Sequence, residues 1–496
     1  MELGSQSWKK KKKGKVQAPP MEITKIMGSG ASENRVDLTF FSDGYLESEK
    51  QKFIDDVTWL VDEIAGNQTF HTVSPLLNFW AAFTPSNETG VGVGGKPKET
   101  PYGLYRDGTE LRALYYAYPE VGRAACQALG DKCNYPILIG NDPLYGGLGG
   151  EFTTITPSVA NGPLILRHEL GHSVIRVGEE YDGGFAYFGP NAGHDLSELP
   201  WTQWLTKPLI KDTLFEPRVE RSVMPLQAYP WTLLNTTKPW STTFLSSGTY
   251  SRYLVRFSLS GLPEKGDVSV LFDGEDLGWE PKEGLGMDRY HYDIYRDDTL
   301  SEGEHEVKFM LNTEEREGVA QLCNVEILEF GSDPDEFNST AGFYGVFPTF
   351  SEKNETSYRP TNEDCLMRIV TTPNFCSACV EGLWHSLLKR VDLIDNITTT
   401  CQLTPFGTWK RTFELFLVPI GQFREDETNA AESYKIEWKK DGKPISKYEN
   451  ATVLEVSGSE GGEWEVEVMF ETEEVRVDPE DLLTSWRGIS VDGGCV

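Results

Sequence analysis

A histidine-bearing stretch inside a helical pattern constrains this chain more than any other feature. The run from Leu164 to Val177 is largely apolar and contains no helix breaker except the tolerable Gly171, so it predicts a buried helix. Positions four apart lie on one face of a helix. His168 and His172 can therefore point at one position, with Glu169 beside them.

This HExxH spacing offers two nitrogen ligands for Zn²⁺ and a carboxylate next to the metal. Zinc lowers the pKa of its bound water toward about 7. Glu169 can deprotonate that water for attack on a carbonyl and then pass the proton to the leaving amine. The structural alternative is two core histidines that bond to backbone groups.

A catalytic zinc also needs a third protein ligand and an open fourth position. Three carboxylates, Glu179, Glu180 and Asp182, follow Gly178, which can end the helix and turn the chain back toward the metal. On this ground alone all three remain candidates.

Charge and length bound the class of protein. The chain has 46 basic and 77 acidic residues and a net charge of −31, which argues against nucleic acid as a partner. No stretch approaches twenty uninterrupted apolar residues, so no membrane span is expected. A length of 496 residues allows two to four domains.

Cysteines and glycosylation sequons indicate the secretory route. The eight cysteines form an even set, as a disulfide framework prefers. Cys126 and Cys133 form the expected local pair. Cys376 and Cys379 are a single CxxC, for which a disulfide is favoured over a second zinc site. Seven Asn-x-Ser/Thr sequons occur, at Asn67, Asn87, Asn235, Asn338, Asn354, Asn396 and Asn450.

The first residues look different from a secretion signal. Lys9 to Lys13 form a basic run with no apolar segment beside it, so no signal peptide is recognised in this sequence. Residues 1–33 are predicted to be a disordered arm.

The next part alternates strand and helix patterns, which favours an α/β sheet with helices packed on it. Strands are expected at 34–45, 77–83 and 135–140, and helices at 46–64 and 111–129. The glycine-rich segment 141–150 then leads to the alternating run Glu151 to Ile155. That run is either an ordinary strand after a mobile loop or an edge strand that pairs with an extended substrate.

Two further regions consist of short alternating strands separated by Gly/Asp turns. Residues 245–333 predict a β-sandwich inserted into the catalytic domain, which would span 34–244 and 334–402. Residues 403–496 predict a C-terminal immunoglobulin-like β-sandwich. Both are interpreted as scaffold.

Three motifs carry a family resemblance. The segment HELGHSVIRVGEEYD (168–182) resembles the igalysin (immunoglobulin A peptidase) signature HEFGHSFxGLADEYD, with Ile175 and Arg176 where the family has small residues or Gly. The strand NRVDLTFFSDGY (34–45) resembles NRVDIVFLGDGYT. The segment from Tyr358 to Cys379 resembles YRPSxxCLMR…FCxVC. Together these matches cover roughly residues 30–205 and 355–391.

The resemblance implies a metzincin-like catalytic domain, with a twisted mixed sheet plus an active-site helix. His168, His172 and Glu179 would bind Zn²⁺, with Glu180 as second choice for the third ligand, and Met367 would form an apolar floor beneath the metal. Tyr181 or Tyr358 would stabilise the oxyanion. His194 is interpreted as a surface histidine that supports the cleft wall rather than a ligand.

We therefore expect a secreted, monomeric zinc endopeptidase in which Glu169 is the general base and the substrate is an extended protein or peptide segment. A first alternative is a gluzincin-like peptidase with a more distant third ligand such as Glu198. A second is a non-catalytic zinc-containing protein that binds glycan or protein.

Overall fold

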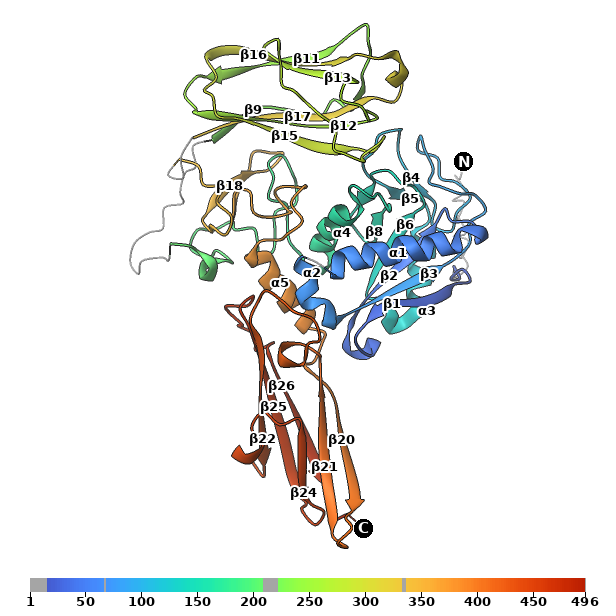
Figure 1. Cartoon of the computed structure of the whole chain (residues 1–496), viewed down its shortest axis with the longest axis vertical. Coiled ribbons are helices and arrows are strands. Elements are labelled where there is room, and N and C mark those ends of the chain that lie inside the picture. Colours follow the sequence, from blue (N-terminus) through green and yellow to red (C-terminus); the bar gives the residue numbers. More distant parts are fainter. Residues whose placement is uncertain (1–15, 67, 208–221, 332–335, 496) are drawn as a thin grey trace, which may run out of the picture.

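The computed structural model describes residues 16–66, 68–207, 222–331 and 336–495. The chain forms three parts, which follow one another from top to bottom in Figure 1 as a β-sandwich, an α/β part and an elongated β part. Residues 1–15 of the arm predicted to be disordered, which include Lys9 to Lys13, and the sequon at Asn67 lie outside the described residues.

A six-stranded mixed sheet forms the centre of the α/β part, in the order β1-β3-β2-β6-β8-β7. The four inner strands run parallel, while β1 and β7 at the edges run antiparallel to their neighbours. The strands are β1 (Glu22–Gly28), β2 (Val36–Asp43), β3 (Leu77–Phe83), β6 (Tyr135–Gly140), β7 (Gly147–Leu148) and β8 (Thr153–Ile155). A two-stranded ribbon is formed by β4 (Leu104–Tyr105) and β5 (Tyr115–Tyr116).

Helices cover both faces of this sheet. Residues of α1 and α4 share one apolar core with the inward side chains of β2 and β3, whereas Ala125 of α3 packs with Phe41 and Leu138 on the opposite face. The helices are α1 (Lys50–Ala65), α2 (Thr69–Val73), α3 (Pro119–Leu129), α4 (Gly162–Leu170) and α5 (Ser377–Leu388). The predicted α/β class is confirmed in this mixed form.

Two predicted segments differ from the structure. The arm predicted to be disordered contains β1, which pairs with β3 through backbone hydrogen bonds from Glu22 to Gly28. Its alternation of apolar and polar residues is too short to stand out beside the lysine-rich start. The helix predicted over 111–129 begins only at Pro119, because the residues before it form β5 and its approach.

The free edge of the sheet is not the strand predicted from Glu151 to Ile155. That strand, β8, lies between β6 and β7, and the two-residue β7 is the outer strand. Gly147 of β7 also donates to the carbonyl of Arg112 over 3.4 Å. The exposed edge is therefore short and begins at Leu148.

The inserted sandwich pairs two antiparallel sheets, ordered β10-β17-β12-β15 with β9 beside β17, and β11-β16-β13-β14. It begins by Ser222, whereas the sequence placed its start at 245, because β9 and β11 complete the two sheets. Its strands are β9 (Ser222–Ala228), β10 (Thr232–Leu233), β11 (Trp240–Ser247), β12 (Arg252–Ser260), β13 (Val268–Phe272), β14 (Glu275–Asp276), β15 (Tyr290–Arg296), β16 (Glu302–Leu311) and β17 (Gln321–Phe330).

The chain then returns to the α/β part through a hairpin and α5, and ends in a second β part. The hairpin is β18 (Phe347–Phe350) with β19 (Thr356–Arg359). The C-terminal sheets are β20-β21-β24 and β23-β22-β25-β26. Their strands are β20 (Ile394–Leu403), β21 (Trp409–Leu417), β22 (Glu432–Lys440), β23 (Lys443–Pro444), β24 (Val453–Ser457), β25 (Gly462–Thr472) and β26 (Thr484–Val491).

The C-terminal sheets are joined to the α/β part by α5. Trp384 of α5 is fully buried and packs on Phe470 of β25, so the two parts share one apolar core. Buried Glu381 accepts hydrogen bonds from Trp204 on one side and from the backbone of Arg476 and Val477 on the other. The C-terminal part is therefore firmly docked.

Cysteine pairing follows the sequence in part. The predicted Cys126–Cys133 disulfide is confirmed, and a second disulfide joins Cys401 to Cys495. The disulfide favoured for Cys376 and Cys379 is wrong, since both are free. Among the described residues, no helix combines the length and apolar character required to cross a bilayer.

The inserted sandwich holds the start of α4 through one buried carboxylate. Asp288 accepts hydrogen bonds from the backbone N–H of Tyr145, from the Ser158 hydroxyl and from the Asn161 amide, at 2.5, 2.5 and 3.1 Å. Asn161 is the residue immediately before α4. The insertion thus fixes the position of the histidine-bearing helix.

Replacing Asp288 with Ala should therefore destabilise the protein by about 2–4 kcal/mol, because three buried donors lose a charged acceptor. Urea unfolding followed by tryptophan fluorescence measures the change. Asp298→Ala, at an exposed position of the same insertion, is the matched control. Equal stability of the two variants would rule out this bracing role.

Candidate metal centre

The helix that carries the two histidines ends differently from the prediction. α4 ends at Leu170 and continues as one wide π-helical turn over Gly171–Ile175. Arg176, with φ 64° and ψ 50°, then reverses the chain in the left-handed region. The predicted terminator, Gly178, instead lies where its missing side chain lets the backbone of Phe188 approach.

The turn brings the first acidic residue after the helix back to the histidines. Glu179 Oε1 lies 3.1 Å from His172 Nε2, and Glu179 Oε2 lies 3.5 Å from His168 Nε2. The ligand atoms of all three residues lie within 4.8 Å of one another. Two imidazoles and one carboxylate therefore converge from the helix and from the segment after it.

The hydrogen bonding of His172 prepares it to bind a cation. Its Nδ1 lies 2.9 Å from the carbonyl oxygen of Val177, which can only accept, so Nδ1 carries the proton. Nε2 faces Glu179 Oε1 over 3.1 Å and is the nitrogen whose lone pair a metal ion would take. This arrangement of a second hydrogen bond behind the ligand nitrogen is typical of metal-binding histidines, and the donor set fits a zinc ion.

The electrostatics of the cluster also favour a positive charge at its centre. Burial raises the pKa of Glu179, but the charge of His168 and hydrogen bonds from both histidines outweigh it and lower the pKa to about 2. Burial lowers the pKa of His168, but the charges of Glu179 and Glu169 raise it to about 9. Glu179 is therefore ionised at neutral pH and attracts a cation.

Glu169 lies beside this cluster with its carboxyl group enclosed. Burial raises its pKa, although the positive charges of the two histidines oppose the shift. The backbone N–H of Gly149, just after β7, hydrogen-bonds to the carboxyl group. A Cβ atom on Gly149 would lie 2.5 Å from Glu169 Oε2, so only glycine leaves Glu169 in this place.

Replacing Gly149 with Ala should displace the Glu169 carboxylate and lower any hydrolysis at this centre by about 10²-fold, because a 1 Å misplacement of a catalytic group can have an effect of this size. Metal content should not change. Steady-state kinetics and elemental analysis measure the two quantities. Gly266→Ala, where a Cβ meets nothing within 4 Å, is the control, and full activity of Gly149→Ala would contradict this role of the glycine.

An apolar floor closes the cluster from below. We call residues 360–376 the floor loop. A Cβ on Gly171, between the two histidines, would lie 3.2 Å from Met367 Sδ and 3.0 Å from Phe375, and Met367 is fully buried. The backbone N–H of Glu180 donates to the Met367 carbonyl over 3.0 Å. The floor loop thus holds residues 179–182, which we call the acidic segment, against the helix.

The other candidate residues are placed as follows. Glu180 is buried and turned away from the histidines, toward Asn191 and Cys365. Tyr181 hydrogen-bonds to Glu179. Tyr358 pairs through its backbone with Gly193, and its side chain packs against the main core. The remaining two, His194 and Glu198, are exposed and do not belong to the described cluster of His168, His172 and Glu179.

One group of side chains near this centre was not predicted from the sequence. Glu180, Cys365, Cys376 and Cys379 are all buried, and their ligand atoms lie within 4.8 Å of one another. The CxxC pair and the third cysteine before it were visible in the sequence. Their convergence with Glu180 was not, because it depends on the path of the floor loop.

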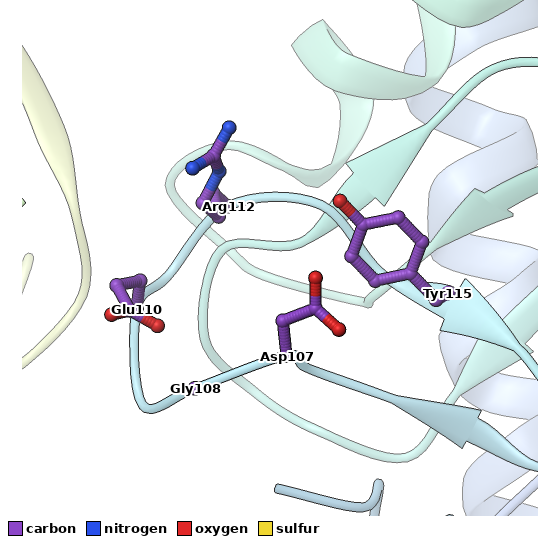
Figure 2. Close-up of a pocket in the computed structure, with 5 residues that line it drawn as sticks. All are labelled: Asp107, Gly108, Glu110, Arg112 and Tyr115. Atoms are coloured by element: carbon purple, nitrogen blue, oxygen red, sulfur yellow. The ribbon is translucent and has the colours of Figure 1, made fainter. Parts of the chain in front are cut away.

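A pocket lies on the loop between β4 and β5. Its volume is about 260 Å³, and Figure 2 shows the side chains around it. Asp107, Glu110, Arg112 and Tyr115 line it. The carbonyl of Arg112 is also the group that accepts from Gly147, so this pocket adjoins the edge of the sheet and contains none of the three converging residues.

Comparisons with known proteins bear on the α/β part. Residues 24–213 match the model of the family described as IgA peptidase M64, and the igalysin resemblance is confirmed. That family is one of metallopeptidases, which implies a bound metal and a protein substrate. No curated protein matches the chain.

Similarities to solved structures are weak. A GH2 β-galacturonidase from Eisenbergiella tayi is 10% identical over 51% of this chain and 35% of its own, with a TM-score of 0.13. The exo-chitosanase CsxA from Amycolatopsis orientalis is 11% identical over 51% and 25%, with a TM-score of 0.12. A β-glucosidase from Kluyveromyces marxianus is 9% identical over 52% and 46%, with a TM-score of 0.17. The chain spans about a third of the length of the first of these proteins and a quarter of the second. These similarities carry no argument about fold or function.

Proposed function

We propose that this chain, whose residues 24–213 match the IgA peptidase M64 family, is a secreted zinc endopeptidase with a metzincin-like catalytic domain. His168, His172 and Glu179 hold the metal, and Glu169 is the general base. The observation that carries the proposal is the convergence of two imidazole nitrogens and one ionised carboxylate within 4.8 Å, with a buried carboxyl group beside them.

The chemistry divides between the metal and Glu169. When bound, zinc activates water at neutral pH and polarises the scissile carbonyl. Glu169 accepts the proton of the attacking water and gives it to the leaving amine. Its raised pKa suits both transfers, because a group that takes and returns a proton works best when its pKa approaches the working pH. The hydrogen bond from the Gly149 N–H keeps the Glu169 carboxylate in the same orientation during both proton transfers.

Tyr181 is the better placed of the two tyrosines proposed to stabilise the oxyanion. Burial and the charge of Glu179 raise its pKa well above its ordinary value, so the phenol keeps its proton. Without substrate this proton is donated to Glu179, and with substrate bound it would be donated to the oxyanion instead. A single positioned donor of this kind contributes about 3 kcal/mol to stabilisation of the transition state.

The substrate is a protein segment in extended conformation. Beyond Leu148 the outer strand β7 offers a backbone edge that leads to Glu169, and an extended chain can add to such an edge by main-chain hydrogen bonds. Only a short stretch of edge is open, because Arg112 already accepts from Gly147. Cleavage should therefore require an unstructured segment rather than a folded surface.

Secretion and a monomeric state complete the proposal. The two disulfides support an oxidising compartment. Five sequon asparagines are exposed, namely Asn87, Asn235, Asn354, Asn396 and Asn450. Asn338 is 8% exposed and its carbonyl accepts from Asn362, so a glycan is not expected there.

The test is metal-dependent proteolysis by the full chain. Purified protein is incubated with an unfolded protein substrate, with and without a chelator, and new termini are mapped by mass spectrometry. The chelator should abolish internal cleavage, and added zinc should restore it. A cleavage pattern that persists in the metal-free protein would refute the proposal, as would zinc-loaded protein that cleaves no unfolded substrate.

A further inference from the structure

We propose that Cys365, Cys376, Cys379 and Glu180 form a second metal site, which binds a structural zinc ion. This site is separate from the histidine cluster and does not depend on catalysis by it. Glu180 supplies one carboxylate oxygen and the three cysteines supply thiolates, which together make a closed four-ligand set.

The spacing of the sulfur atoms fits such a set. Cys376 Sγ lies 3.6 Å from Cys379 Sγ, and Cys365 Sγ lies 3.8 Å from Cys379 Sγ. A tetrahedron of ligands at the Zn–S distance of about 2.3 Å has edges of about 3.8 Å. All four ligand atoms lie within 4.8 Å of one another, so one ion can reach all of them with small adjustments.

The surroundings of Glu180 provide a second, independent observation. Its side chain is fully buried. Oε1 accepts from the Asn191 amide over 2.9 Å, but Oε2 has no hydrogen-bond partner among the residues that the structure describes. A buried carboxylate is costly unless an opposite charge or hydrogen bonds compensate it. A cation shared with the thiolates supplies that charge.

Disulfide bonds alone cannot pair all the cysteines of this cluster. Three of them meet, and one disulfide would leave the third unpaired inside the core. The remaining free cysteine, Cys323, lies on β17 in the inserted sandwich and cannot join them. Soft sulfur ligands in a four-coordinate arrangement favour zinc over magnesium or calcium.

The position of the site gives it a mechanical role. Cys365 lies two residues before Met367 in the floor loop, Cys376 and Cys379 lie at the start of α5, and Glu180 follows Glu179. One ion would therefore join the floor loop, α5 and the acidic segment. It would fix the backbone from which Glu179 reaches the histidines.

The first test counts metals in the full chain by elemental analysis after loading with zinc and desalting. Wild-type protein should hold two zinc ions, and His172→Ala should hold one. Cys376→Ser should lose the thiolate-bound ion, whereas Cys323→Ser, at a buried free cysteine outside the cluster, should keep the wild-type count. Glu180→Gln, which preserves the shape near Asn191, should weaken zinc at this site by about tenfold or more. A wild-type zinc count that Cys376→Ser leaves unchanged would overturn the proposal.

Two further measurements do not depend on whether Cys376→Ser folds. X-ray absorption of zinc-loaded His172→Ala should show sulfur neighbours at about 2.3 Å, and its cobalt form should show sulfur-to-cobalt charge transfer. Alkylation in denaturant with chelator and no reductant should modify four cysteines. Modification of only two would reveal a disulfide within the cluster, and an all-nitrogen/oxygen zinc environment would likewise reject the site.

Discussion

Glu169→Gln is expected to lower kcat/KM for protein substrates by about 10²–10⁴-fold, the usual contribution of a positioned general base. Gln keeps the size of the side chain but cannot accept the proton of the attacking water. Because Glu169 is not among the three converging ligands, the variant should bind zinc as the wild type does. Kinetics with an unfolded substrate and elemental analysis on the same sample separate the two effects.

A control variant and a contradicting outcome complete this test. Glu198→Gln changes an exposed acid outside the cluster and should leave kcat/KM unaltered. If Glu169→Gln retains wild-type activity, the carboxylate is not the base. The protein would then cleave by a different mechanism, whereas wild-type protein that cleaves no substrate would fit the non-catalytic binding alternative.

Glu179→Gln is expected to weaken zinc binding at the histidine cluster by at least about 100-fold. Loss of a residue that only hydrogen-bonds to a metal ligand lowers affinity by about 10- to 100-fold, and loss of a charged ligand should have a larger effect. Activity should fall with metal occupancy and recover in part at high zinc. In the metal-free protein the pKa of His168 should fall from about 9, since the Glu179 charge that raises it is removed. Zinc titration and histidine NMR measure these changes.

The same experiment decides between two positions for the third ligand. If Glu198→Gln loses zinc and Glu179→Gln keeps it, the gluzincin-like alternative is right. Unchanged zinc affinity in Glu179→Gln would also place the ligand elsewhere. Glu180→Gln should leave the histidine site occupied, because its side chain points to the cysteine cluster.

Local patterns predicted much of the fold. The helix predicted to carry two histidines four apart is α4 together with the π-helical turn over Gly171–Ile175. The Asp441-Gly442 turn is the tight connection between β22 and β23, with positive φ at both residues. Alternating runs of five residues gave the sandwich strands, because one face of each is buried and the other is not. These features depend on neighbours in sequence, which a single chain displays directly.

Features that depend on distant contacts escaped prediction. The outer strand β7 has two residues, too few for any periodicity. Arg176 adopts a left-handed conformation that favours glycine. An arginine at this position does not predict that conformation. Glu180 and Cys365 meet only because the floor loop returns after an insertion of more than a hundred residues.

The split of the α/β part has a consequence for the order in which the protein matures. Domains generally fold as units while the chain emerges from the ribosome. The floor beneath Gly171, with Met367 and Phe375, is synthesised after the whole inserted sandwich. The nascent chain therefore exposes the histidines long before their support exists, and a completed, hydrolytically competent centre arises only when synthesis has passed α5.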